Sequence, residues 1–83
     1  MVRDKKTKQY VVIELKRGQT SDRTVGQLAR YMSWVKEKLA SNKDVKGIII
    51  TSTKDENLDY ALRMIPNTEL LQYQIQFSLK KAK

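Results

Sequence analysis

A switch in hydrophobic period, from two residues to 3.6 and back to two, most constrains how these 83 residues can fold. Tyr10–Lys16 is rich in β-branched and aromatic residues and is followed by Gly18, which predicts a strand. Ser21–Ala40 carries apolar residues at steps of three and four, which predicts an amphipathic helix. Gly47–Ser52 is a short apolar run, typical of a strand buried on both faces of a sheet. This order predicts an α/β fold in which the helix packs across both strands.

The predicted helix has one core-facing side and one internal glycine. Its N-cap is Ser21 or Thr20. Gly26 destabilises a helix by roughly 1 kcal/mol relative to alanine, so we expect close packing or the approach of a ligand there. The residues expected to face the core are Val25, Leu28, Met32, Val35 and Leu39.

The second half of the chain repeats the alternation. A second helix begins at Thr53 or Asp55 and ends at Pro66, because proline cannot continue a helix. Its inward residues are Leu58, Ala61, Leu62 and Ile65. The alternation over Leu70–Leu79 predicts a half-buried strand. With a hairpin at the N-terminus, these elements predict one domain over residues 1–83, with a three-layer α/β core, a mixed sheet and the order β-hairpin–α–β–α–β.

Charge and composition limit the partners and the chemistry. The chain has 17 Lys and Arg against 9 Asp and Glu, and its net charge of +8 favours nucleic acid as a partner, with an anionic membrane surface second. No apolar run approaches the roughly 20 residues of a membrane span, so we expect no membrane insertion and a cytoplasmic protein. The absence of cysteine and histidine excludes thiolate and imidazole sites. Catalysis would therefore need carboxylates, lysines, tyrosines, hydroxyls or a hard metal ion.

Glu14 and Lys16 are the first candidates for such chemistry. The period of a strand places both side chains on one face. The carboxylate can bind Mg²⁺ through oxygen, and the lysine can stabilise a deprotonated water or the charge that develops at phosphorus. The same pair could instead be an exposed salt bridge beside a helix.

A polar and aromatic strip lies beside the apolar side of the first helix. Residues four apart share one helical face, as Gln27 and Tyr31 do. The strip offers amide, guanidinium and ring groups to a phosphate backbone or a base. Alternatively, Tyr31 and Trp34 belong to the periphery of the core. The residues of the strip are Arg23, Gln27, Arg30, Tyr31 and Trp34.

Two segments, VVIELKRG and VGQLARYMSWV, resemble the C-terminal nuclease domain of the NucS/EndoMS type, in the RecB-like branch of the PD-(D/E)XK superfamily. Three later segments, VKGIIITS, LDYALRMIP and YQIQFSL, are similar to the remaining elements of that domain, so the resemblance covers nearly all of the chain from about Val2. It implies a restriction-endonuclease-like fold. It also implies an endonuclease of DNA repair that hydrolyses DNA phosphodiesters with Mg²⁺ or Mn²⁺.

The resemblance assigns roles to individual residues. Glu14 matches the acidic metal ligand, Lys16 matches the catalytic lysine, and Gln27 and Tyr31 match the motif that supports the catalytic site and contacts DNA. The backbone carbonyl of Leu15 is a further expected metal ligand. Members of that family act on branched, flapped, single-stranded or mismatched DNA, usually as homodimers held by a separate N-terminal domain. We expect DNA phosphates to be bound by Lys16, Arg17, Arg23, Gln27, Arg30, Tyr31 and the lysines of the turn at residues 5–8.

The sequence departs from the superfamily pattern in lacking an aspartate on the strand before Glu-x-Lys. Asp4 is the only acidic residue before Glu14. If the hairpin turns between Lys6 and Thr7, Asp4 faces Gln9, and the position opposite Glu14 falls before Met1. Asp4 is then a turn residue and not a metal ligand. We therefore expect an N-terminally truncated domain with an incomplete active site and weak activity.

Two alternatives remain open. The chain could be a nucleic-acid-binding module that keeps the nuclease fold without its activity, or a basic module whose partner is a protein. Metal-dependent cleavage separates the nuclease from the first alternative, and salt-dependent DNA binding separates both from the second.

Overall fold

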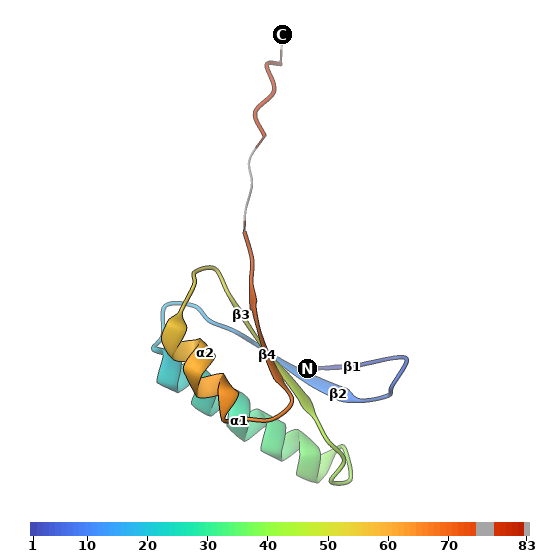
Figure 1. Ribbon diagram of the computed structural model, residues 1–83. Helices are drawn as coiled ribbons and strands as arrows, with labels where there is room; N and C mark the ends of the chain where they lie inside the picture. Colours follow the sequence, from blue (N-terminus) through green and yellow to red (C-terminus); the bar gives the residue numbers. More distant parts are fainter. Residues whose placement is uncertain (75–77, 83) are drawn as a thin grey trace.

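The computed structural model describes residues 1–74 and 78–82 of the chain. Among them, four strands form one sheet in the order β1-β2-β3-β4, and two helices lie on one side of it (Figure 1). β1 is antiparallel to β2, whereas β2, β3 and β4 are parallel. This mixed sheet confirms the predicted α/β class and the order of elements. The elements are β1 (Val2–Arg3), β2 (Tyr10–Leu15), α1 (Ser21–Lys38), β3 (Lys46–Thr51), α2 (Glu56–Arg63) and β4 (Thr68–Gln72).

The N-terminal hairpin has the predicted register. Val2 pairs with Val11, and the N–H of Asp4 donates to the carbonyl of Gln9 over 2.7 Å. The Asp4 carboxylate accepts hydrogen bonds from the backbone N–H groups of Lys6 and Thr7, at 2.8 and 3.1 Å. Such bonds to the following backbone are how aspartate stabilises a turn. Asp4 is therefore a turn residue, as its position in the sequence predicts.

Both helices cover the same face of the sheet (Figure 1). The crossovers β2-α1-β3 and β3-α2-β4 advance in the same direction, and right-handed crossovers of that kind lie on one side. The described residues therefore supply two of the three expected layers. On the other face, Ile48 and Ile50 of β3 are only half-buried, so the expectation that this strand is buried on both faces is wrong.

The core lies between the sheet and α1. Leu28 and Val35 are buried, and they belong to one cluster with Val12 of β2 and Ile49 of β3. Val25 and Met32 pack at its margin, half-buried. Leu39 is 40% exposed, contrary to its predicted inward position. The reason is that α1 ends at Lys38, so Leu39 is the C-cap residue and no longer follows the helical period.

α2 closes the other end of the helical layer. Asp55 is its N-cap, and Leu58 and Leu62 are buried as predicted, while Ala61 and Ile65 are half-buried. Neither helix in the described part of the chain is long and apolar enough to cross a membrane.

The last strand differs from its predicted extent. β4 begins at Thr68, two residues before the predicted start at Leu70, and it ends at Gln72. The Thr68 hydroxyl donates to the carbonyl of Ile65 over 2.8 Å, which ties the start of β4 to the end of α2. Of the predicted alternation, Ile75 and Phe77 lie outside the described residues, and Leu79 is exposed rather than inward-facing.

Close packing occurs at Gly47 and not at Gly26. A side chain at Gly47 would meet the sulfur of Met32 and, at 3.2 Å, a methyl group of Leu28. A Cβ at Gly26 would meet nothing within 4 Å, so the expectation of close packing there is wrong. Gly47 therefore lets α1 approach the central strand of the sheet.

Substitutions at these two glycines should have opposite effects on stability. Gly47→Val adds a branched side chain where Met32 and Leu28 already lie, so we expect the free energy of unfolding to fall by about 1–3 kcal/mol. Gly26→Ala adds a methyl group in open space on a helix, so we expect a gain of up to about 1 kcal/mol. Urea denaturation followed by circular dichroism measures both. A stabilised Gly47→Val protein would contradict this packing.

Candidate active site

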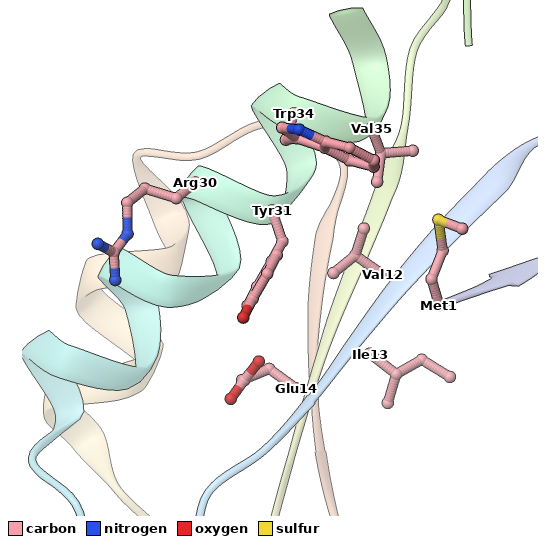
Figure 2. Close-up of a pocket in the computed structure, with 8 residues that line it drawn as sticks. All are labelled: Met1, Val12, Ile13, Glu14, Arg30, Tyr31, Trp34 and Val35. Atoms are coloured by element: carbon pink, nitrogen blue, oxygen red, sulfur yellow. The ribbon is translucent and has the colours of Figure 1, made fainter. Parts of the chain in front are cut away.

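A groove of about 670 Å³ runs between β2 and α1, and Glu14 lies in it (Figure 2). Glu14 approaches from the strand, and Tyr31 extends from the helix toward it. The guanidinium of Arg30 points away from Glu14. The groove thus combines a carboxylate with aromatic rings. Its lining residues are Met1, Val12, Ile13, Glu14, Arg30, Tyr31, Trp34 and Val35.

Glu14 and Lys16 lie on the same face of the sheet, as predicted. Glu14 shares the groove with Val12 beneath α1, and Lys16 reaches Asp55 at the start of α2. The two side chains nevertheless have different surroundings. Glu14 faces the groove, whereas the Lys16 ammonium lies 3.8 Å from a carboxylate oxygen of Asp55. The alternative of a surface salt bridge between Glu14 and Lys16 does not describe this arrangement.

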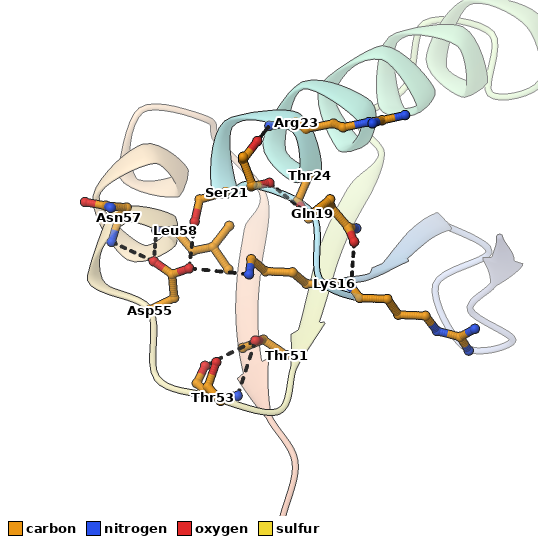
Figure 3. Close-up of polar contacts among 12 residues, drawn as sticks. Lys16, Gln19, Ser21, Arg23, Thr24, Thr51, Thr53, Asp55, Asn57 and Leu58 are labelled. Carbon is orange, nitrogen blue, oxygen red and sulfur yellow. Dashed lines mark hydrogen bonds and ion pairs between the residues drawn. The ribbon is translucent and has the colours of Figure 1, made fainter.

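Asp55 links Lys16 to both helices (Figure 3). One of its carboxylate oxygens accepts the hydroxyl hydrogen bond of Ser21 over 2.6 Å and pairs with Lys16. The other accepts from the N–H groups of Asn57 and Leu58 at 3.0 and 3.2 Å. The side chains of Lys16 and Asp55 are 17% and 19% exposed, so solvent reaches this pair only in part. The network fixes where the lysine sits relative to α1 and α2.

The same contacts shift the titration of Asp55. The hydrogen bond from Ser21 lowers the pKa of the Asp55 carboxyl most, followed by the Leu58 N–H. Burial opposes these two bonds and raises the pKa, and the Asn57 N–H and the positive charge of Lys16 lower the pKa further by smaller amounts. All these partners stabilise the ionised form. Asp55 therefore stays charged beside Lys16 at neutral pH.

Leu15, the expected second metal ligand, already has a hydrogen-bond partner. Its carbonyl accepts from the side-chain amide of Gln19 over 3.3 Å, and the oxygen of that amide accepts from the Arg17 N–H over 2.7 Å. β1 pairs with β2 only as far as Val11, so this stretch of the β2 edge has no neighbouring strand in the described residues. A carbonyl has two lone pairs, so Leu15 can still accept one more partner.

The described residues fit a divalent metal only in part. Within residues 1–74 and 78–82, no three acidic side chains come together as a metal-binding group. Glu14 is the carboxylate of the groove, and no residue of β1 stands opposite it. Mg²⁺ in phosphoryl-transfer sites is commonly held by one or two carboxylates together with substrate phosphates. Glu14 therefore supplies the one carboxylate that such a site needs at least. The groove, as the described residues form it, offers no second carboxylate.

The other predicted site residues are distributed along α1 and around its start. Gln27 is half-buried and lies one helical turn before Tyr31, outside the lining of the groove. Arg17, Arg23 and Arg30 are exposed. Tyr31 and Trp34 are 56% and 53% exposed, so they lie at the edge of the core with about half of each side chain open to solvent.

Sequence reasoning missed the roles of three residues. Ser21 and Asp55 were recognised only as helix starts, and Gln19 was not singled out. The helix-capping pattern of Asp55 is visible in the sequence. Its contact with Lys16 is not, because it depends on both crossovers lying on the same face of the sheet.

The mixed sheet with two helices is consistent with the fold of a PD-(D/E)XK nuclease. The sequence matches the family described as the YhcG PDDEXK nuclease domain over residues 2–83, and the chain belongs to that family. The superfamily predicted from the motifs is thereby confirmed. The match is to the YhcG family and does not support the narrower NucS/EndoMS assignment. Comparisons with curated proteins and with solved structures gave no match.

Replacing Asp55 with asparagine should change how stability depends on pH. Because the pKa of Asp55 is lowered in the fold, its ionised form stabilises the protein above the usual aspartate pKa of about 4, and this contribution is lost as pH falls through the folded value. Asparagine can still cap α2 but does not titrate. We therefore expect Asp55→Asn to lose less stability than the parent between about pH 5 and pH 3.

Denaturation midpoints measured across that range test this expectation. Asp44→Asn, which removes the charge of a carboxylate that is 73% exposed, is the matched control. An equal loss of stability on acidification in the parent and the Asp55→Asn protein would contradict the role given to this network.

Proposed function

We propose that this nuclease domain is a metal-dependent endonuclease that hydrolyses DNA phosphodiesters in substrates of the DNA-repair type. The observation that carries the proposal is Glu14, a groove-facing carboxylate on the same face of β2 as Lys16. The resemblance of the motifs to the NucS/EndoMS domain supports branched, flapped, single-stranded or mismatched DNA as the substrate.

In this proposal, Glu14 and the substrate phosphate would hold Mg²⁺ or Mn²⁺, which would supply a Lewis acid for the hydrolysis. Lys16 stabilises the negative charge that develops at the phosphate. An ammonium has three donors, so Lys16 can remain paired with Asp55 while it donates to a phosphate oxygen. Tyr31 lies beside Glu14, where its hydroxyl can orient the substrate strand. Gln27 is half-buried one helical turn before Tyr31, and in this proposal it supports the catalytic site from there.

The exposed arginines supply the electrostatic attraction. Arg17 follows β2, Arg23 lies in the first turn of α1, and Arg30 lines the groove. With a net charge of +8, the chain is expected to bind DNA mainly through phosphates and with little sequence preference. Lys16 is largely buried, so it is suited to one reacting phosphate and not to general DNA binding.

The second candidate function is a DNA-binding module without activity. It is favoured by the lining of the groove, in which Glu14 is the one acidic residue among the described residues. A missing ligand loosens the placement of the attacking water, and such misplacement can lower a rate by about 100-fold. We therefore expect cleavage by these residues alone to be slow.

Cleavage assays with Mg²⁺ or Mn²⁺ on flapped, mismatched and single-stranded DNA distinguish the two functions. We expect weak cleavage that Glu14→Gln and Lys16→Met abolish, with Glu37→Gln, an exposed carboxylate of α1, as the matched control. Adding an antiparallel strand that pairs with β2 and carries aspartate opposite Glu14 should raise the rate by about 100-fold or more.

Two outcomes would contradict this assignment. If the chain cleaves equally fast with and without the added strand and Asp4→Asn abolishes cleavage, then Asp4 is the second ligand. If neither protein cleaves while Glu14→Gln binds DNA as well as the parent, the chain is a binding module.

Single arginine substitutions should change the salt dependence of DNA binding. Each phosphate contact that is lost should reduce the slope of log affinity against log salt by about 1. We expect this for Arg17→Ala, Arg23→Ala and Arg30→Ala. Arg63→Ala is the control, because the Arg63 guanidinium is already held by Asp59 at 2.8 Å. Fluorescence anisotropy with labelled DNA at several salt concentrations measures the slopes. Equal slopes for all four proteins would exclude these contacts.

A further inference from the structure

We propose that Trp34 and Tyr31 form a stacking site for an unpaired nucleobase, so that the groove selects DNA that is single-stranded next to the bond to be cleaved. This inference rests on the proposed nuclease function and adds to it the two residues that recognise the unpaired part of the substrate. Its evidence is the exposure and placement of the two rings.

The two aromatic residues occupy one wall of the groove. They are three positions apart on α1, so their side chains lie on neighbouring parts of one helical face. Tyr31 extends toward Glu14, and the Trp34 ring lies farther along the groove, next to Val35 (Figure 2). An unpaired base held against Trp34 would therefore place its strand across Tyr31 toward the carboxylate.

The floor of the groove keeps the two rings apart from the core. Val12 and Val35, which line it, are buried core residues with 4% and 2% exposure. Both valines belong to the close-packed core cluster, so the groove ends on packed side chains. The volume of about 670 Å³ lies in the range of small-ligand sites, roughly 300–1,000 Å³. The groove is therefore preformed and open to an aromatic ligand.

Two other aromatic rings of the described residues are each covered by a cation. The Tyr60 ring is covered by the guanidinium of Arg63 at 4.7 Å, and the Tyr10 ring by that of Arg3 at 5.1 Å. In the same description, no cation covers Tyr31 or Trp34. Their ring faces are available for stacking, and Arg30 lies in the adjacent turn to contact the neighbouring phosphate.

Stacking on Trp34 requires a base whose face is free. In a duplex, each base is covered by its neighbours, and unstacking costs a few kcal/mol. Flaps, mismatches and single strands present free faces without that full cost. Stacking on an aromatic side chain is tolerant of sequence because every base has a π face. The groove thus favours DNA by its strandedness and not by its sequence.

Trp34 is the only tryptophan in the chain, so its fluorescence reports directly on this site. The full chain is titrated without divalent metal, which separates binding from cleavage. The ligands are oligo(dT), a blunt duplex of equal length, and an oligonucleotide of equal length with abasic residues at its centre. We expect saturable quenching by oligo(dT) and much weaker quenching by the other two at the same fraction bound.

Variants test the same site by anisotropy with labelled oligonucleotides. Trp34→Ala should weaken binding of oligo(dT) by about 5-fold to 100-fold, which corresponds to the loss of one base–aromatic stack. Binding of the duplex and of the abasic strand should change less than about twofold, and Trp34→Phe should recover part of the loss. Tyr60→Ala, an exposed tyrosine outside the groove, is the matched control. Circular dichroism verifies that each variant is folded.

Several results would overturn the inference. Equal quenching by the abasic strand, or equal weakening of all three ligands in Trp34→Ala, would mean that the groove contacts only the backbone. An unchanged DNA affinity together with altered self-association in sedimentation would make the groove a protein interface. A different result would show that the nuclease proposal alone is wrong. In that case oligo(dT) still quenches the fluorescence of Trp34, but the chain cleaves DNA with neither Mg²⁺ nor Mn²⁺.

Discussion

The contact between α1 and the central strand β3 sets the position of everything else in this domain. Leu28 of α1 and Ile49 of β3 are completely buried, and Gly47 removes the side chain that would hold the helix away. With α1 at this distance from β3, the side of α1 that carries Tyr31 and Trp34 lies over β2. The groove that contains Glu14 lies between that side of the helix and β2. The candidate active site is therefore a direct consequence of how closely one helix packs on one strand.

Much of the fold follows from local sequence signals. The change of hydrophobic period located each helix and strand except the last to within about three residues, because side-chain direction alternates with a different period in each. The Asp4 turn gave the hairpin register. Leu39 and Gly26 were misjudged, since the end of a helix and the neighbours of a glycine depend on tertiary contacts. The helices' common side of the sheet was likewise not predicted, although the handedness of crossovers requires it.

The candidate site was predictable only in part, for related reasons. The period of a strand is enough to put Glu14 and Lys16 on one face, whatever the rest of the fold. The partner of Lys16 is 39 residues away in Asp55, and no local pattern links the two. Likewise, the exposure of Trp34 depends on the packing of Val12 and Val35 beneath it. Residue types and their spacing thus predict which side chains are candidates for catalysis. Which of those side chains lie close together depends on the tertiary fold.

The Gln19 side chain has a consequence for any strand that joins the free edge of β2. Its amide donates to Leu15 and accepts from Arg17, as the backbone of a neighbouring strand would. An incoming strand must displace this amide, so at these positions it exchanges hydrogen bonds and gains few new ones. The binding energy of such a strand then has to come from contacts of its side chains. Those contacts would be with Ile13 and Leu15, which lie on the face of the sheet that the helices do not cover. Gln19 therefore occupies the hydrogen-bonding positions that a neighbouring strand would use at this edge.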